Sequence, residues 1–406
     1  MLTVMTPEEL LGCIGTVFGP LDRPPEMVGL DRALGRVLAQ DISAAEFVPG
    51  FCRSTVDGYA LRGADTFGCS ESIPALLTQV GAVEMGREPA FSIGPGQCAA
   101  IPTGGALPEG ADAVQMVEHT EHYGGGEIGI VKSVPPGANL IFKGDDVKPG
   151  DLVLRKGRKL EPQDIGALAA LGVTQVPVAP KLRVGILSTG DELVLPDRVP
   201  GPGQVRDVNG PLVAAVAAQA GAEPVPLGII IPDEENQLRA AVERALESCH
   251  CVVLSGGSSV GEKDAACRVM ASVGEVLCHG VAMKPGKPTL LGKAGGKPIL
   301  GLPGHPVAAL FTAKLFLLPL LARLEGRPWA ERTVSAKLAQ TVPANHGRAQ
   351  YTGVTLEEKP DGLWAVPIWG KSGLITTLAG ADGFFCVPRD REGVPAGEIV
   401  EVSLFS

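Results

Sequence analysis

The chain has 406 residues, of which 45% are hydrophobic and only 4% aromatic, with 54 glycines and 35 prolines. This length exceeds what one core supports, so three or four domains with many tight turns are expected. The formal net charge of −10 excludes nucleic acid as the main partner, because phosphate binding requires basic faces. An anionic ligand must therefore be held by locally placed cations.

The chain begins with a predicted helix. In "TPEELL", Thr6 is the expected N-cap, Pro7 lies in the first turn and Glu9 closes a capping box. No basic start or apolar core of a secretion signal accompanies it, which favours a cytoplasmic protein. The nine cysteines form no CxxC, as is typical of reduced, buried thiols. A metal site at residues 249–251 ("CHC") is the less favoured alternative, because a strand is expected to begin there.

Two stretches with short alternating apolar runs predict β-rich domains. Residues 47–146 are rich in glycine and include "AVQMVEH" and "EIGIVKSV". Residues 328–406 include "RTVSAKLAQTV" and "EIVEVSL" and form a C-terminal β domain. Residues 147–181 change from a hairpin to a helix, and they are expected to pack with residues 1–46 as one discontinuous helical domain.

Strand and helix alternate over residues 182–327. Strands are expected at 182–187, 224–230, 251–254, 275–283 and 298–302, and helices at 211–221 and 234–248. This alternation predicts a doubly wound, mostly parallel sheet with helices on both faces. Ligands of such sheets bind beyond the carboxyl ends of the strands.

The most apolar segment, residues 305–324, is interrupted by Lys314, Pro319 and Arg323. A membrane span needs about 20 predominantly apolar residues. We therefore expect a buried helix and no membrane association.

Two of the expected strand ends look alike, because "STGDEL" (188–193) and "SGGSSVGEKD" (255–264) are small-residue turns followed by acids. Turn amides and hydroxyls can hold a phosphate, and nearby carboxylates can hold a Mg²⁺ that bridges to it. Helix capping by Asp191 and Asp264 is the alternative. The absence of GxxxxGK[ST] excludes a P-loop. The candidate ligand-binding residues of these turns are Ser188, Thr189, Gly190, Ser255, Gly256, Gly257, Ser259 and Gly261.

Two further loops carry candidate binding residues. Lys284 and Lys287 flank a glycine turn in "KPGKP", which suits an oxyanion, with ordinary solvated lysines as the alternative. Pro303 and Pro306 bracket "PGHP" before the buried helix, where they are expected to fix the loop against a ligand or to start the helix.

Seven motifs occur in order along the chain: "STVDGYALR", "IPTGGALPEGADAV", "KGDD", "STGDEL", "SGGSSVGEKD", "MKPGKP" and "GLPGHPV". With them the sequence resembles the molybdopterin molybdenumtransferases of the MoeA and gephyrin E-domain type. The resemblance implies release of AMP from adenylated molybdopterin and insertion of molybdate into the dithiolene, with a divalent cation, usually Mg²⁺. It also implies a MogA-like central domain, a barrel-like C-terminal domain, and a homodimer whose active-site cleft is shared between subunits.

The resemblance assigns roles to particular residues. It places Pro288, Ser259, Arg348 of "NHGRAQY" and Ser372 of "KSGL" near molybdate. It suggests Asp264, Asp233 and Glu192 as Mg²⁺ ligands, with an N-cap role as the alternative for Asp233. A purely local turn role is the alternative for Asp57. The expected catalytic residues are Asp57, Thr103, Glu192, Asp264, Lys284 and Lys287.

Two departures from the family pattern fall in one loop. His305 stands where the family usually has Asn, and Ala308 replaces a common Ser. Histidine titrates near neutrality, so we hypothesise altered oxyanion handling, with weaker molybdate affinity or a tungstate preference.

Three functional alternatives stay open. They are a tungstate-inserting paralogue, a molybdopterin adenylyltransferase, and a non-catalytic molybdopterin-binding scaffold. The adenylyltransferase fold resembles residues 182–326 alone, and such an enzyme is also a candidate partner that hands over the substrate.

Overall fold

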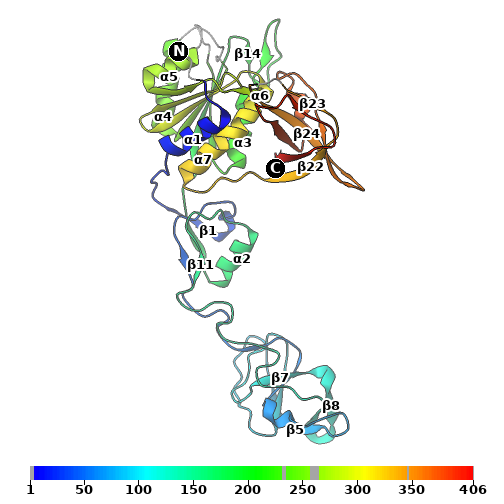
Figure 1. The fold of residues 1–406 in the computed structure, drawn as a ribbon. Coiled ribbons are helices and arrows are strands. Elements are labelled where there is room, and N and C mark those ends of the chain that lie inside the picture. The colour runs from blue at the N-terminus through cyan, green and yellow to red at the C-terminus, as the bar shows by residue number, and fades with distance from the viewer. Residues whose placement is uncertain (1–3, 231–234, 257–264, 345–346, 406) are drawn as a thin grey trace. The chain divides into compact units, whose positions relative to one another are not determined.

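The computed structural model describes residues 4–230, 235–256, 265–344 and 347–405 (Figure 1). The chain forms two compact units. The first combines Met1–Glu26 with Val178–Ser406, and the second is Met27–Pro177.

A six-stranded sheet forms the centre of the first unit. Its strands, in spatial order, are β16 (Glu223–Ile230), β13 (Arg183–Thr189), β17 (Cys251–Ser255), β21 (Lys297–Leu302), β20 (Leu290–Ala294) and β18 (Glu275–His279). The first four run parallel, whereas β20 is antiparallel to both of its neighbours. The mostly parallel sheet predicted from the sequence is confirmed.

Helices cover both faces of this sheet (Figure 1), because alternate strand residues enter two different cores. Val253 of β17 joins the core of one face, and its neighbour Val252 joins the core of the other. The helices of the first face are α1 (Pro7–Val17), α3 (Asn209–Gln219), α6 (Pro306–Thr312) and α7 (Leu318–Glu325). Those of the second face are α4 (Glu235–Ser248) and α5 (Ala265–Val273).

The segment Pro306–Glu325 is one continuous helical stretch, in which a π-helical turn, η5 (Ala313–Leu317), joins α6 to α7. By length and composition it could cross a membrane, yet 89% of its most apolar window is buried inside the protein. The prediction of a buried helix is therefore confirmed. Lys314 is accommodated because its Nζ donates to Gln219 Oε1 (2.8 Å) and to the carbonyl oxygen of Phe405 (2.7 Å).

The N-terminal helix forms as predicted but packs elsewhere. Thr6 Oγ1 accepts from Glu9 N (3.2 Å) while Thr6 N donates to Glu9 Oε2 (2.8 Å), which completes the capping box. The apolar side chains Leu10 and Ile14 then enter the core of the central sheet. The expected association of residues 1–46 with 147–181 therefore holds only from Met27 onward. An apolar helix face packs on whichever core covers it best, and the sequence does not specify which.

The C-terminal strands close into a barrel, since β24 pairs with both β25 and β26 and completes the ring. Its strands, in order around the ring, are β24 (Ala349–Lys359), β25 (Gly362–Pro367), β22 (Thr333–Leu338), β28 (Ile399–Leu404) and β26 (Gly383–Val387). Smaller elements of this unit are β14 (Leu193–Val194), β15 (Val205–Arg206), β19 (Met283–Lys284), β23 (Val342–Pro343), β27 (Gly393–Val394) and η6 (Ile375–Leu378). The predicted barrel-like domain is confirmed.

The second unit contains a six-stranded sheet and a smaller helical part. The sheet strands, in order, are β7 (Ala113–Met116), β4 (Gly58–Leu61), β6 (Gln97–Ile101), β5 (Ala75–Ala82), β9 (Glu127–Ile130) and β8 (Thr120–Tyr123). Short strand pairs are β1 (Glu26–Gly29) with β12 (Gln175–Val178), β2 (Ile42–Ser43) with β11 (Leu152–Leu154), and β3 (Arg53–Ser54) with β10 (Leu140–Ile141). The helices are α2 (Pro162–Ala170) and four 3-10 turns, η1 (Leu30–Arg32), η2 (Gly63–Thr66), η3 (Val117–His119) and η4 (Gly124–Gly126).

Candidate functional site

A cavity of about 1200 Å³ lies in the first unit, between the central sheet and the barrel. The loop after β21 and the turn after β19 form one wall, and β24 with residues 368–378 forms the other. The cavity lies beyond the carboxyl end of β21, where open α/β sheets commonly bind their ligands. Six predicted binding residues line this cavity: Lys284, Lys287, Pro288, Pro303, Arg348 and Ser372.

Strand pairing between the central domain and the barrel brings Lys284 close to the segment that carries Arg348. The short strand β19 leaves the central domain and pairs with β24, so that Lys284 lies opposite Gln350 and Met283 opposite Ala349. Arg348 directly precedes β24, and both charged side chains are exposed at the cavity. This pairing therefore places cations from two separate domains on adjoining segments of the cavity lining.

The turn that separates Lys284 from Lys287 requires glycine. Gly286 has φ +121°, and an added Cβ would lie 2.9 Å from the Met283 side chain. Thr289 Oγ1 donates to the carbonyl oxygen of Gly286 at 2.7 Å, which fixes the turn from below. The backbone of this turn is thus held in place, while both lysine side chains are exposed.

The charge of the cavity has one sign. Four cationic side chains line it: Lys284, Lys287, Arg348 and Lys371. The described lining residues include no Asp or Glu, although the whole chain carries a net charge of −10. Clustered cations around a concave surface raise the local concentration of anions, so the arrangement favours an anionic ligand.

The loop of "PGHP" is held from two sides. On one side, Asn209 Nδ2 donates to the carbonyl oxygens of Gly304 (2.9 Å) and Pro303 (3.4 Å). On the other, Val307 N donates to the carbonyl oxygen of Ser372 (3.0 Å), and His305 Nδ1 lies 2.7 Å from Ser372 Oγ. The predicted role of this loop as a fixed wall is consistent with these contacts, and Pro306 begins α6.

Sequence reasoning missed two buried polar residues beneath this loop. Asp207 is 8% exposed and its Oδ1 accepts from Gly210 N (3.0 Å) at the start of α3. Asn209 is 6% exposed, and its Oδ1 has no hydrogen-bond partner among the described residues. The sequence pattern that could have indicated them is the pair of polar residues in "VRDVNG" at the start of an apolar helix. Asp and Asn at such positions usually form hydrogen bonds with the nearby backbone.

The described parts of the two predicted phosphate-binding turns lie next to this loop. Gly256 has φ +90°, and an added Cβ would lie 2.1 Å from the carbonyl oxygen of Thr189. Likewise, a Cβ on Gly304 would lie 3.7 Å from Gly256 Cα. The ends of β13, β17 and β21 therefore meet at one place. The hydroxyl-bearing residues Ser188, Thr189 and Ser255 are buried there, and Thr189 Oγ1 donates to the carbonyl oxygen of Ser255 (3.3 Å).

The predicted Mg²⁺ site is only partly described. Glu192 is exposed after β13, beside Gly190, where an added Cβ would lie 2.7 Å from Glu192 Oε2. Within the described ranges, no group of three or more His, Cys, Asp or Glu side chains could hold a metal ion. Five of the predicted ligand and metal residues lie outside the described residues: Asp233, Gly257, Ser259, Gly261 and Asp264.

Asp57 and Thr103 lie in the second unit, where the structure joins them to each other. Asp57 Oδ1 accepts from Thr103 N (2.7 Å) and from Thr103 Oγ1 (3.1 Å). Gly58 follows at a close approach of two strands, where an added Cβ would lie 1.8 Å from the carbonyl oxygen of Gln115. Both polar residues are exposed, and the two hydrogen bonds from Thr103 use the same oxygen of the carboxylate, Oδ1.

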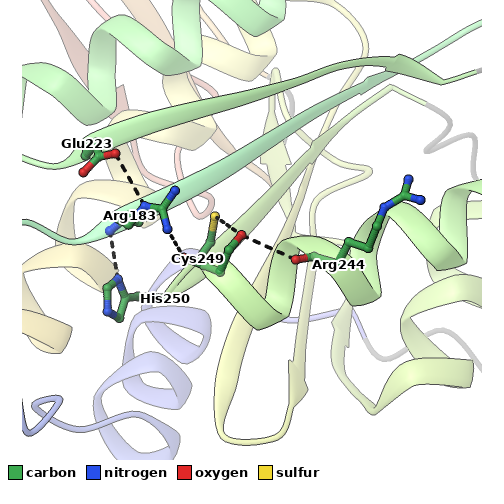
Figure 2. A network of polar contacts seen from close by, with 6 residues as sticks. Arg183, Glu223, Arg244, Cys249 and His250 are labelled. Carbon is green, nitrogen blue, oxygen red and sulfur yellow. Dashed lines mark hydrogen bonds and ion pairs between the residues drawn. The ribbon is translucent and has the colours of Figure 1, made fainter.

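The alternative metal site at Cys249-His250-Cys251 is instead part of a structural network at the amino end of the sheet (Figure 2). His250 Nδ1 accepts from the backbone N of Arg183 (2.9 Å), so this nitrogen cannot also bind a metal. Burial, reinforced by nearby cationic charges, lowers the pKa of His250. Burial also raises the pKa of the Cys251 thiol to about 12, which opposes the thiolate that a metal would need.

Comparison with known proteins begins with matches to three family descriptions in chain order. Residues 5–172 match "MoeA N-terminal region (domain I and II)", 185–323 match "Probable molybdopterin binding domain", and 335–405 match "MoeA C-terminal region (domain IV)". The molybdopterin molybdenumtransferase of Bacillus subtilis (strain 168) is 33% identical over 93% of this chain and 89% of its own. The chain belongs to the MoeA family.

Other members of the MoeA family agree with this assignment. The molybdopterin molybdenumtransferase of Haemophilus influenzae is 33% identical, with 95% of each chain covered. The crystal structure of a molybdopterin biosynthesis MoeA protein from Pyrococcus horikoshii has a TM-score of 0.85 at 38% identity, with 99% of each chain covered. The resemblance predicted from the seven motifs is therefore confirmed, and so is the predicted multidomain fold.

Proposed function

We propose that this chain is a molybdopterin molybdenumtransferase of molybdenum cofactor biosynthesis, which releases AMP from adenylated molybdopterin and inserts molybdate into the dithiolene. Membership of the MoeA family supports the reaction class. The observation that carries the proposal is the cavity lined by four cations and, among its described residues, no carboxylate. Molybdate and the substrate phosphates are anions, and an acidic chain can bind them only where cations are concentrated.

Some residues of the cavity would neutralise the charge of the ligand, and others would maintain the shape of the cavity. Lys284, Lys287 and Arg348 would neutralise the oxyanions, because charge-assisted hydrogen bonds are the strongest that side chains make. Ser372 would add a neutral hydroxyl. The proline residues Pro288 and Pro303 would keep the two loops in place while the pterin enters.

Mg²⁺ fits the side chains that the family resemblance offers for it. Carboxylate oxygens are the ligands that Mg²⁺ prefers, and Glu192, with Asp233 and Asp264 outside the described residues, would hold it. When bound, the ion would supply charge neutralisation at the phosphoanhydride. The turn residues that would then receive the phosphate are Ser188, Thr189, Gly190, Ser255 and Gly256.

We also propose that Asp57 and Thr103 act in the reaction as a fixed pair. The two hydrogen bonds from Thr103 orient the carboxylate of Asp57, and an oriented carboxylate is a better ligand or base than a mobile one. A cytoplasmic homodimer and direct handover from a molybdopterin adenylyltransferase are further expectations of the family resemblance. Light scattering of the purified chain tests the dimer.

The decisive experiment measures AMP release from adenylated molybdopterin with Mg²⁺, in parallel without oxyanion, with molybdate and with tungstate. Wild type is compared with Asp264→Asn. Release that is stimulated by molybdate and collapses in the variant supports the proposal and the metal ligand together. Stimulation by tungstate alone would identify a tungstate-inserting paralogue. Tight substrate binding with no release under any oxyanion would contradict an enzyme and support a scaffold.

A further inference from the structure

His305 and Ser372 are 67 positions apart in the sequence and meet in the wall of the cavity. The distance from His305 Nδ1 to Ser372 Oγ is 2.7 Å, and the bond from Val307 N to the carbonyl oxygen of Ser372 (3.0 Å) holds the two segments together. His305 is the N-cap residue of α6, but its side chain makes no capping hydrogen bond. The ring of His305 therefore forms a hydrogen bond with Ser372 and does not cap the helix.

This hydrogen bond has two proton arrangements with different consequences for the cavity. If Nδ1 carries no proton, the hydroxyl of Ser372 donates to it, and the hydroxyl can then not donate to a ligand. If Nδ1 is protonated, it donates to Ser372 Oγ, and the hydroxyl proton is free to point at a ligand. The imidazolium form always has protons on both nitrogens. Each neutral tautomer leaves one donor for a ligand, either Nε2–H or the hydroxyl of Ser372, so protonation of His305 adds one donor and makes both available.

Among the described residues that line the cavity around this pair, the charged groups all have the same sign. Lys284 and Lys287 belong to the segment of β19 and its turn, Arg348 precedes β24, and Lys371 adjoins Ser372. The described part of the cavity wall contributes no carboxylate that could face the ring. Without a bound ligand, the four cations disfavour a fifth positive charge on the imidazole of His305. A bound dianion favours this charge. Lysine and arginine keep their charge near neutral pH, so the imidazole is the group of the cavity wall that responds.

We propose that His305 and Ser372 form a proton-coupled pair that binds the oxyanion. As a tetrahedral dianion enters, His305 takes one proton from solvent, donates Nδ1–H to Ser372 Oγ, and leaves the hydroxyl proton of Ser372 to the oxyanion. No covalent bond other than this N–H is formed, and one proton is gained for each dianion bound. The pair rests on the proposed function, since it acts on molybdate in the same cavity. It makes His305 a specificity-determining residue for the oxyanion.

Calorimetric titration of the full chain with molybdate, without pterin, tests this coupling. Titrations in two buffers that differ in ionisation enthalpy measure the protons taken up, and molybdate stays a dianion across the range used. We expect uptake of up to one proton, and an affinity that falls by up to about tenfold per pH unit as the pH rises through the range where imidazole titrates. In His305→Asn, uptake disappears and the affinity varies less than about twofold over the same range.

Two further variants separate the pair from general effects. His122→Asn removes an exposed histidine of the second unit and should retain the proton uptake of wild type. Ser372→Ala should retain proton uptake but bind molybdate roughly 3–10-fold more weakly, because it loses one hydrogen-bond donor. This variant also keeps the test open if His305→Asn does not fold.

Several outcomes would overturn the coupling. Wild-type binding without proton uptake, or uptake that persists in His305→Asn, removes the role of the imidazole. If molybdate still stimulates AMP release under those conditions, the proposed function survives and only the coupling is lost. If molybdate does not bind at any pH and does not stimulate release, the coupling and the proposed use of the cavity are both wrong.

Discussion

His250 and His305 lie at opposite ends of the central sheet, and their hydrogen bonds differ in kind. At the amino end, His250 accepts from the backbone of Arg183, whose side chain also donates to the carbonyl oxygen of Ser248 (2.8 Å) and pairs with Glu223 (3.4 Å) (Figure 2). At the carboxyl end, His305 bonds a single hydroxyl beside four cations that face a cavity.

Under the proposed function, the amino end of the sheet contributes to stability and the carboxyl end binds the oxyanion. Polar groups that satisfy one another fix the structure and leave little for a ligand, because each buried donor or acceptor is already paired. Polar groups that face a cavity with charges of one sign are stabilised fully only when an anion enters. Four changes test this contrast, and they follow from the largest expected effect to the smallest.

Charge reversal should separate the two ends most strongly. Lys287→Glu places a carboxylate in the cationic cavity, and we expect the affinity for molybdate to fall at least about 100-fold, since placing like charges next to each other costs several kcal/mol. Lys181→Glu makes the same change in net charge before β13, at the amino end, where salt screens it over about 8 Å. Calorimetric titration of both variants should show that the affinity for molybdate changes less than twofold in the control, Lys181→Glu. Equal losses would mean that overall charge, and not the cavity, governs binding.

Removal of Asn209 should destabilise the protein itself. Asn209→Ala leaves the carbonyl oxygens of Pro303 and Gly304 without this donor, and a lost partner of this kind costs about 1–3 kcal/mol of unfolding free energy. Denaturant unfolding measures the change. The loop that carries His305 should loosen as well, so molybdate affinity falls with stability. An unchanged midpoint would show that the loop does not depend on this side chain.

Acid should weaken the network at the amino end. Burial, with nearby cations, lowers the pKa of His250 below the ordinary value of 6.5, so the unfolded chain binds a proton more readily than the folded one. Stability is therefore complete above this value and falls as the pH decreases below it, by at most about 1.4 kcal/mol per pH unit from this residue. His250→Gln should show a shallower loss in unfolding experiments between neutral and mildly acidic pH. An identical slope would assign the acid sensitivity to other groups.

The exposed ion pair of the same network should matter least. Arg183 and Glu223 have side chains that are 40% and 53% exposed, and exposed pairs contribute about 0.2–1 kcal/mol. Glu223→Gln should therefore change the unfolding free energy by less than about 1 kcal/mol and leave molybdate binding unchanged. A larger loss would indicate that the pair also supports the backbone bond to His250.

The sequence by itself determined the features that depend on neighbours along the chain. The capping box at Thr6 and Glu9 was predictable because both partners lie within one helical turn. The parallel strands were predictable from short apolar runs between helices, whereas β20 (Leu290–Ala294) was missed because its glycine and lysine interrupt the run. The cationic residues Lys284 and Lys287 were predicted from the glycine turn of "KPGKP", whereas Arg348 and Ser372 were assigned through the family resemblance.

Only the tertiary structure decided which of these residues meet. The pairing of β19 with β24 joins Lys284 to the segment of Arg348, and the closure of the barrel against the central domain brings Ser372 to His305. Neither contact has a local signal, since strand pairing and domain packing depend on complementary surfaces far apart in the chain. The same reason explains why the contact of Asn209 with Gly304 could not be predicted, although Asn209 itself has a local signal, and why α1 packs on the central sheet. Features that depend on neighbouring residues can be predicted from the sequence, whereas the geometry of the cavity arises from long-range packing.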